Sequence, residues 1–552
     1  MNRSIAIVLP CLFLLAALLS SNGCSLSSNE RLISKLTTIE TSRGKIVNQI
    51  NSFWLSPDGK RLAYIYNEPV ERKPGQMSVN PKSSIVVDGS RGRQYDNIQW
   101  FVFSPDSKRY AYVATKDNKF AVVVDGAEGK SYDYPPFGPD RDHPILFSPD
   151  SKHVAYCAMT GPKSYVVVKD SVEGKQYDKN DGLLTDLPIM FSPDSKTLVY
   201  IGSLQEPGKN WGWFKQVVVQ NGVEGKRYNQ VHSLTFSADS QHFTYLARDD
   251  TINGPRRYRI LDGSESQMFA SAIDPAPIRF SLDGKRMLIL QGTLTVDGVE
   301  IDKRVDQAIF SPDSQRIAYV KSIDWNKTYG GAAYLVGVDG HEEGPYRSMP
   351  TNITFSPDSQ RIAYVASASM DAYERRLVVV VDGQSGKPYD WGISNLTFSP
   401  DSKHLAYIAN TGPQDGRIFV VSDGTEGPLY SHVANPVFST DGRLAYVVTK
   451  ANINKSFVVV SGVEGKYYTW VSRPTFSPDG KHVVYFAREG NDFFAVVDGV
   501  EMKHYERIFG HEAYPYLSSS DDKTVIVFDT DSSFHYLAQS GENIYLVKET
   551  IK

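Results

Sequence analysis

Short apolar runs alternate with tight polar turns along almost the whole chain. The clearest case is residues 310–320 (FSPDSQRIAYV), which recur letter for letter at residues 355–365. Successive copies start 38 to 48 residues apart, except for one gap of 30 residues, so the sequence predicts a repeat architecture of twelve copies. The other copies begin at Phe103, Phe147, Phe191, Phe236, Phe280, Phe398, Phe438 and Phe476, with variants at Leu55 and Leu517.

Each copy predicts four short strands. In the copy at Phe355, residues 352–355 form a first strand, Ser-Pro-Asp-Ser has the chemistry of a type I turn, and residues 362–365 form a second strand. The unbroken apolar run 377–381 is typical of a strand buried on both faces, and the Asp-Gly after it signals a hairpin to a fourth strand. This pattern predicts a β-propeller blade. A solenoid is the alternative, although it does not demand two antiparallel hairpin turns per period.

The FSPDS and VVVDG segments resemble those of the WD-repeat-like propeller family typified by the C-terminal domain of the TolB protein. The resemblance covers residues 38–545, and propeller domains of prolyl-oligopeptidase-type enzymes carry a looser version of it. The Trp-Asp ending of true WD repeats does not recur, and the separate α/β domain of TolB has no counterpart. The resemblance therefore implies a fold and leaves the role of the protein open.

The predicted fold is an all-β propeller of about twelve four-stranded blades, divided into two six-bladed rings in tandem, since usual rings have four to eight blades. The short gap before Phe310 sets the boundary near residue 300, giving a first propeller over 38–300 and a second over 301–552. Division into five and seven blades, or exchange of a half-blade between rings, is the alternative. Residues 38–50 read as half a blade that completes a sheet formed late in the chain. The run 534–547 contains strands of its own and leaves one strand unplaced.

Residues 1–23 read as a secretory signal peptide, with Arg3 before an apolar core that is short for a membrane span. Cys24 after Gly23 resembles the lipidation site of a bacterial lipoprotein, followed by a polar tether over residues 24–37. Ser21 stands where such sites usually carry Leu, so cleavage by the ordinary signal peptidase is the alternative. The protein is expected to be exported to the periplasm, or to the outer membrane or cell surface as a lipoprotein.

The two kinds of hairpin turn are expected on one face of the propeller, and the loops of variable length on the other. Insertions collected on one face usually mark a binding surface. Aromatic residues in and near these loops are the candidate binding residues, with packing between blades as the alternative, and for Trp391 and Trp470 packing is the favoured interpretation. The candidates are Trp211, Trp213, Phe214, Trp325, Tyr329 and Tyr373 in the loops, and Trp100 near the start of an innermost strand.

Other repeated side chains have structural interpretations. The Asp of each Ser-Pro-Asp is expected to hold its turn, and His153, His242, His404 and His482 share one surface position after it. Cys157 reads as a small buried apolar residue. Inter-blade packing is expected for Tyr95, Tyr132, Tyr177, Tyr228 and Tyr389.

The chain carries a formal charge of −4 and is 41% hydrophobic, which does not favour a nucleic-acid partner. It contains no G-x-S-x-G, H-E-x-x-H or phosphate-binding Gly motif, so no enzyme activity, cofactor or metal is predicted. The expected function is a lipid-anchored scaffold that binds an envelope protein, peptide or glycan. The alternatives are a structural surface protein and a propeller lyase or hydrolase acting on polysaccharide or peptide, with His143, His232, Asp140 and Asp142 in its channel.

Overall fold

The structure, a computed structural model, is built from β-strands and turns. In the residues that it describes, no helix is long and apolar enough to cross a membrane. The all-β class predicted from the repeats is confirmed. The described residues are 26–35, 38–41, 44–47, 52–68, 81–136, 144–178, 189–206, 214–251, 254–265, 277–326, 331–371, 376–412, 418–450, 453–509 and 526–551.

Five four-stranded antiparallel sheets come first along the chain. The first sheet contains β4 (Phe53–Leu55), β5 (Leu62–Asn67), β6 (Ser83–Val87) and β7 (Ser90–Tyr95). The second contains β8 (Asn97–Phe103), β9 (Tyr110–Lys116), β10 (Lys119–Val124) and β11 (Ala127–Tyr132). The third contains β12 (Ile145–Phe147), β13 (Val154–Gly161), β14 (Ser164–Lys169) and β15 (Val172–Asp178). The fourth contains β16 (Ile189–Phe191), β17 (Leu198–Gln205), β18 (Phe214–Gln220) and β19 (Val223–Tyr228). The fifth contains β20 (Gln230–Phe236), β21 (Phe243–Thr251), β22 (Gly254–Leu261) and β23 (Ser264–Glu265).

A seven-stranded sheet and three more four-stranded sheets follow. The seven strands are β24 (Ile278–Phe280), β25 (Met287–Leu290), β26 (Gly292–Val296), β27 (Val299–Phe310), β28 (Ile317–Asn326), β29 (Gly331–Val338) and β30 (His341–Tyr346). The first of the four-stranded sheets that follow contains β31 (Thr351–Phe355), β32 (Ile362–Ser367), β33 (Leu377–Val381) and β34 (Gln384–Ser385). The second contains β35 (Gly392–Phe398), β36 (Leu405–Asn410), β37 (Ile418–Ser422) and β38 (Thr425–Glu426). The third contains β39 (His432–Phe438), β40 (Leu444–Lys450), β41 (Lys455–Val460) and β42 (Val463–Glu464).

The last two sheets have five strands each, and the second of them includes the first strand of the chain. One contains β43 (Trp470–Val471), β44 (Thr475–Phe476), β45 (Val483–Glu489), β46 (Asp492–Val497) and β47 (Val500–Glu501). The other contains β48 (Arg507–Ile508), β49 (Val527–Thr530), β50 (Ser533–Ser540), β51 (Asn543–Ile551) and β1 (Leu26–Lys35). A separate hairpin is formed by β2 (Thr38–Thr41) and β3 (Gly44–Val47).

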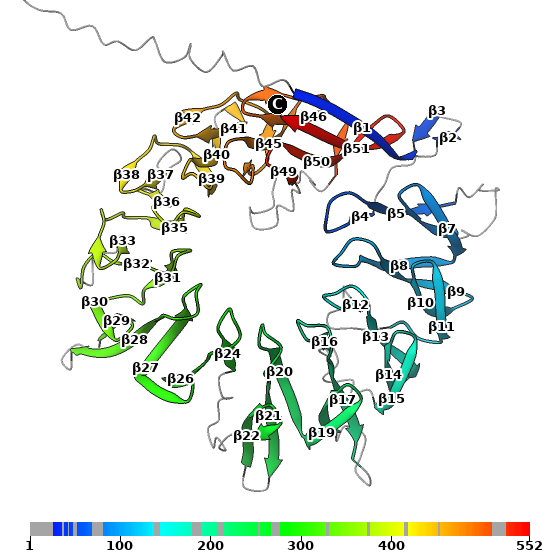
Figure 1. Cartoon of the computed structure of the whole chain (residues 1–552), viewed down its shortest axis with the longest axis horizontal. Coiled ribbons are helices and arrows are strands. Elements are labelled where there is room, and N and C mark those ends of the chain that lie inside the picture. Colours follow the sequence, from blue (N-terminus) through cyan, green and yellow to red (C-terminus); the bar gives the residue numbers. More distant parts are fainter. Residues whose placement is uncertain are drawn as a thin grey trace, which may run out of the picture.

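The sheets are arranged as the blades of a β-propeller. Figure 1 shows them following one another around the molecule, with the first strand of each four-stranded sheet toward the middle and the later strands toward the outside. The second and third strands carry most of the core; every residue of β32, for example, is buried. Such strands pack against the neighbouring sheets on both faces, which explains their unbroken apolar sequences.

The N-terminal strand β1 completes the last sheet by pairing antiparallel with β51. The prediction that an N-terminal segment completes a late sheet is confirmed, but the segment was wrong: residues 26–35 do this, whereas 38–41 and 44–47 form the separate hairpin. Residues expected in a polar tether therefore form a strand, which pairs through its backbone with β51 and buries Ile33 and Ser34. The spare strands of the run 534–547 are β50 and β51. The twelfth copy placed at Leu517 lies largely outside the described residues.

The expected boundary near residue 300 falls inside β27. The N-terminal part of this strand pairs with β26 and its C-terminal part pairs with β28, so one strand belongs to two successive repeats. Contacts also join the last sheet to the first, where Lys60 Nζ lies 2.8 Å from Asp529 Oδ1 and His535 Nε2 lies 2.8 Å from the Asp58 carbonyl oxygen. The contacts bring the last sheet beside the first, and the division into two rings stays a prediction.

Candidate functional site

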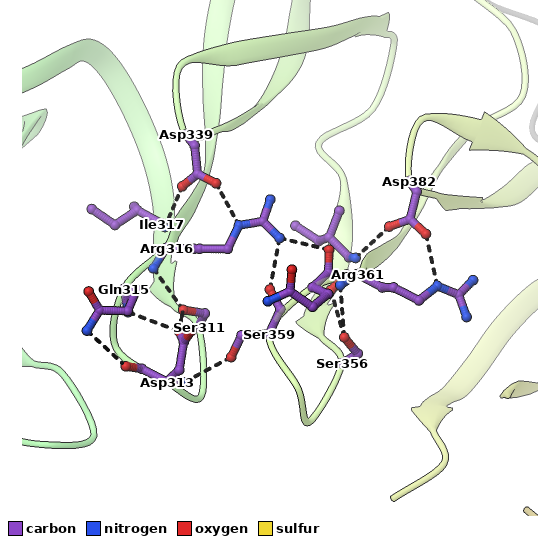
Figure 2. Close-up of polar contacts among 12 residues, drawn as sticks. Ser311, Asp313, Gln315, Arg316, Ile317, Asp339, Ser356, Ser359, Arg361 and Asp382 are labelled. Atoms are coloured by element: carbon purple, nitrogen blue, oxygen red, sulfur yellow. Dashed lines mark hydrogen bonds and ion pairs between the residues drawn. The ribbon is translucent and has the colours of Figure 1, made fainter. Parts of the chain in front are cut away.

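The Ser-Pro-Asp turns are held by a hydrogen-bond network that repeats from sheet to sheet. Ser311 Oγ donates to Asp313 Oδ1 at 2.5 Å, and the same oxygen accepts the backbone N–H of Gln315 at 3.0 Å (Figure 2). The N–H of Arg316 donates back to Ser311 Oγ at 2.9 Å. The N–H of Asp313 donates to Ser359 Oγ in the next sheet at 2.9 Å. The predicted turn role of these aspartates is confirmed, and the turns also join neighbouring sheets.

Arg316 links three structural elements through its guanidinium group. Its Nε lies 2.6 Å from Asp339 Oδ2 in the Asp-Gly turn of the same repeat, which shows that the two kinds of turn share one face, as predicted. Its Nη1 donates to the carbonyl oxygens of Ser359 (2.8 Å) and Gln360 (2.9 Å), and its Cζ lies 5.4 Å from the Phe355 ring centroid. Figure 2 shows the polar contacts of Arg316 and the pairing of its counterpart Arg361 with Asp382. The same contacts are made by Arg61, Arg109 and Arg286 in their repeats. In four other repeats this position is a histidine that pairs with an aspartate: His153, His242, His404 and His482.

A second network joins the outer strands of neighbouring sheets. The Tyr132 hydroxyl donates to Glu173 Oε1 at 2.7 Å, and Lys130 Nζ donates to the same oxygen at 2.8 Å. Burial, together with this carboxylate, holds the pKa of Tyr132 well above its usual value of 10.0. The packing role predicted for the repeated tyrosines is confirmed, since all of them are buried: Tyr95, Tyr132, Tyr177, Tyr228 and Tyr389.

The structure tests only some of the aromatic residues proposed for binding. Phe214 begins β18 and is buried, so its placement in an exposed loop was wrong. Trp100 is half-buried against the core that contains Val113 and Val122, in line with the packing alternative. The backbone of Trp325 belongs to β28, and its side chain is not described. The remaining candidates, Trp211, Trp213, Tyr329 and Tyr373, lie outside the described residues.

Trp391, for which packing was the favoured prediction, is exposed and is a better candidate for ligand binding. Trp391 is 57% exposed, and its backbone N–H donates to the Asn410 carbonyl oxygen at 3.2 Å. It borders a cleft of about 380 Å³ between β35 and β39, the first strands of two neighbouring sheets. The residues that line the cleft include His432 but no Asp, Glu, Lys or Arg. Trp391 therefore has an environment better suited to a ligand than that of Phe214 or Trp100.

Two asparagine side chains in this cleft are available to a ligand. Both β35 and β39 contain a β-bulge, and Asn395 (φ 54°) and Asn435 (φ 55°) lie in the bulges with left-handed backbone conformations that asparagine tolerates. Neither amide group has a hydrogen-bond partner among the described residues. A bulge redirects the side chain it carries, and both asparagines line the same cleft as Trp391. Asn recurs three residues before Phe355, Phe398 and Phe438, and the last two of these asparagines line the cleft.

The cleft offers a flat aromatic face beside neutral hydrogen-bonding groups. An indole stacks on an apolar ligand face, while an amide both donates and accepts hydrogen bonds. The Asn410 Oδ1 atom already accepts the Gly412 N–H at 3.0 Å, so its amide is held in place. This combination suits a neutral polar ligand, such as a sugar ring or a peptide segment.

The residues proposed for catalysis or metal binding are only partly described. His143, Asp140 and Asp142 lie outside the described residues, and His232 Nδ1 lies 3.0 Å from Ser233 Oγ. Among the described residues, no group of three His, Cys, Asp or Glu side chains could hold a metal ion. Cys157 is buried, as predicted, and burial raises the pKa of its thiol to about 12.

No protein-family model matches the sequence, and no curated protein matches it. Solved structures similar to this chain include the β-propeller domain of the Trilobed protease from Pyrococcus furiosus, which is 12% identical with a TM-score of 0.24, over 62% of this chain and 98% of that one. The tricorn protease is 11% identical with a TM-score of 0.24, over 82% of this chain. The alignment covers 48% of the tricorn chain, about half of its length. These likenesses bear on the fold alone.

The prediction that this chain is not an enzyme is contradicted, because both similar structures come from proteases. A likeness at a TM-score of 0.24 carries no argument about a reaction. The missing catalytic motifs therefore do not make the chain a non-enzyme, and the likeness does not assign it an activity.

Proposed function

We propose that this protein is an exported, lipid-anchored β-propeller that serves as a binding scaffold in a bacterial cell envelope. The observation that carries the proposal is the cleft at Trp391, where an exposed indole stands beside the amides of Asn395 and Asn435, which have no hydrogen-bond partner within the described parts of the chain. Indole faces and neutral amides bind sugar rings and peptide segments, and the partner is accordingly an envelope protein, peptide or glycan.

The N-terminal segment and the repeats support the location proposed for this protein. The apolar leader and Cys24 support export and lipidation, and the FSPDS and VVVDG segments support kinship with TolB-like propellers. The protein is proposed to reside in the periplasm, or at the outer membrane or cell surface, held by its N-terminal lipid.

Photo-crosslinking in the native envelope tests the binding site. A photoreactive residue is placed at Trp391 and, as a matched control, at Val463, which is 68% exposed on the face of the Asp-Gly turns. A discrete adduct from position 391 that is missing from position 463 supports the proposal. Equal labelling at both positions, or none at 391, contradicts it. Cleavage of the captured partner in place of stable binding would assign an enzyme.

Labelling with a fatty-acid analogue tests the anchor. The native chain is expected to take up the label and to sediment with membranes, whereas the Cys24→Ser variant takes up none. An unlabelled native chain would favour the soluble secreted form.

A further inference from the structure

The fourth repeat departs from the arginine network of the turn face. The position held by Arg or His after the Ser-Pro-Asp turn is Thr197 there, and the Asp-Gly aspartate is replaced by Asn221. Asn221 Oδ1 still accepts the Leu198 N–H at 2.9 Å, as aspartate does in other repeats. The backbone of the turns is thus unchanged, and only the side chain that bridges to the next sheet is missing.

The groups that receive this side chain in other repeats are all present in the β20–β23 sheet. These are the Phe236 ring and the carbonyl oxygens of Ser240 and Gln241, which correspond to Phe147, Ser151 and Lys152 in the contacts of Arg109. No arginine, lysine or histidine side chain of the described residues lies over Phe236. A cleft of about 720 Å³ lies at this point, lined by Thr197, Asn221, Phe236, Ser240 and Gln241 among others.

The chain itself shows how this arrangement binds a guanidinium group. Nη1 of Arg109 lies 3.2 Å and 2.6 Å from the two carbonyl oxygens, and its Cζ lies 5.5 Å from the Phe147 ring centroid. Arg286, with 3.2 Å, 2.8 Å and 5.3 Å, repeats this geometry. A planar guanidinium group can reach two carbonyls and lie over a ring at once, which an ammonium group on a flexible stem does less well.

We propose that the cleft at Thr197 binds an arginine side chain supplied by a partner polypeptide. The partner's guanidinium takes the place of the missing internal arginine, against the Phe236 ring and the Ser240 and Gln241 carbonyl oxygens. The carboxylates of Glu224 and Asp262 also line the cleft and favour a cationic ligand, although Glu224 already contacts Lys175 and Asp262 contacts His242. This site lies on the face of the turns, and it does not depend on the cleft at Trp391.

Asn221 limits the affinity expected for the partner's arginine, because it replaces a carboxylate with an amide. Where the position is Arg61, Arg109, Arg286, Arg316 or Arg361, an aspartate oxygen accepts the arginine Nε–H. Asn221 Nδ2 is instead a donor and lies 3.5 Å from the Lys196 carbonyl oxygen. The partner's arginine therefore binds without a directly paired carboxylate. Replacing Asn221 with Asp restores that carboxylate and tightens guanidinium binding, since hydrogen bonds between charged groups are the stronger ones.

A ligand-observed NMR titration of the intact protein tests the proposal, with N-acetyl-arginine methylamide as the probe. The lysine and citrulline counterparts of the probe serve as controls. The arginine probe is expected to bind at least about tenfold more tightly than either control, which corresponds to about 1.4 kcal/mol. Thr197→Arg fills the cleft from within and abolishes binding, and Asn221→Asp increases affinity about tenfold.

Both substitutions introduce residues that the other repeats carry, so the variants are expected to fold, and a thermal melt confirms this. Trp391→Ala, on the opposite face, leaves arginine binding unchanged and separates this site from the proposed scaffold site. The proposal is overturned if the citrulline probe binds as tightly as the arginine probe, or if Thr197→Arg leaves binding intact. It is also overturned if neither the native protein nor Asn221→Asp binds the arginine probe.

Discussion

The Tyr505 hydroxyl donates a hydrogen bond of 2.5 Å to Glu30 Oε1, although 475 residues separate the two in the chain. Lys503 Nζ reaches the same oxygen at 2.8 Å. Glu173 receives a tyrosine and a lysine from its neighbouring sheet in the same way. Glu30 therefore makes in the last sheet the contacts that Glu173 makes in its own sheet, and these contacts join β1 to residues of the preceding sheet.

This tie makes the N-terminal strand important for stability. Ile33 is buried with Leu62, Tyr64 and Leu537 where the last sheet meets the first. Ile33→Asp places an unpaired charge in this core and is expected to lower the free energy of unfolding by about 3 kcal/mol or more. Urea unfolding followed by circular dichroism measures the loss.

The neighbouring residue Leu32 provides the control, since it is 55% exposed on the other side of the strand. Leu32→Asp is expected to change the stability by no more than about 0.5 kcal/mol. Equal losses from the two variants would show that β1 does not pack as described.

The bridge made by Arg316 gives a second prediction. Arg316→Ala removes contacts to Asp339, Ser359 and Gln360 and is expected to cost about 1 kcal/mol, a modest value because the side chains are partly exposed. Arg316→Lys should recover little of this loss, because an ammonium group lacks the planar fork. Arg316→His should recover more, since histidine occupies this position in other repeats. Thermal unfolding of the three variants ranks them, and full recovery by lysine would contradict the bridging role.

Much of this fold can be predicted from the sequence, because each repeat contains recognisable turn motifs. The Ser-Pro-Asp and Asp-Gly turns fix two hairpins per repeat, and their placement on one face follows from strand alternation alone. The recurrence of histidine at the position of His153 is also visible in the sequence. Its pairing with an aspartate sixteen to twenty residues later depends on how the two turns meet in space.

What the sequence could not predict depends on contacts between distant repeats. The strand β1 has no motif of its own, and its pairing with β51 depends on where the last sheet lies. The strand β27 reads as a shortened repeat, and only the structure shows that one strand serves two sheets. Packing was the favoured interpretation for both Trp391 and Trp470, yet Trp470 is half-buried beside a core and Trp391 is exposed.

The single cysteine of the described residues gives a third prediction. Cys157 is 1% exposed, and burial raises the pKa of its thiol to about 12. The thiolate is the reactive form, so the native protein is expected to resist a thiol reagent such as iodoacetamide at pH 8. The same reagent should label the thiol fully in 6 M guanidinium chloride, and mass spectrometry measures both. Rapid labelling of Cys157 itself in the native protein would contradict the burial of β13.

The repeated turns predict a loss of stability in acid. A hydrogen bond from Ser148 Oγ, followed by one from the Lys152 N–H, lowers the pKa of Asp150 to about 2 from its usual 3.8. The folded state thus has the lower pKa, so the stabilisation is complete above about pH 4 and is lost as the pH falls towards 2. Because turn aspartates such as Asp313 and Asp358 also have lowered pKa values, the losses should accumulate.

Urea unfolding at pH 5, 4, 3 and 2.5 tests this dependence. The midpoint is expected to fall steeply below pH 4, because the unfolded chain binds protons there that the folded turns do not. Ser148→Ala removes the main hydrogen bond to Asp150, so this variant should be less stable at pH 5 and should lose less on acidification. Ser131→Ala, at an exposed position of β11, serves as the control and should retain the native slope. A midpoint that stays constant down to pH 2.5, or identical slopes for the two variants, would show that the turn carboxylates do not stabilise the sheets in this way.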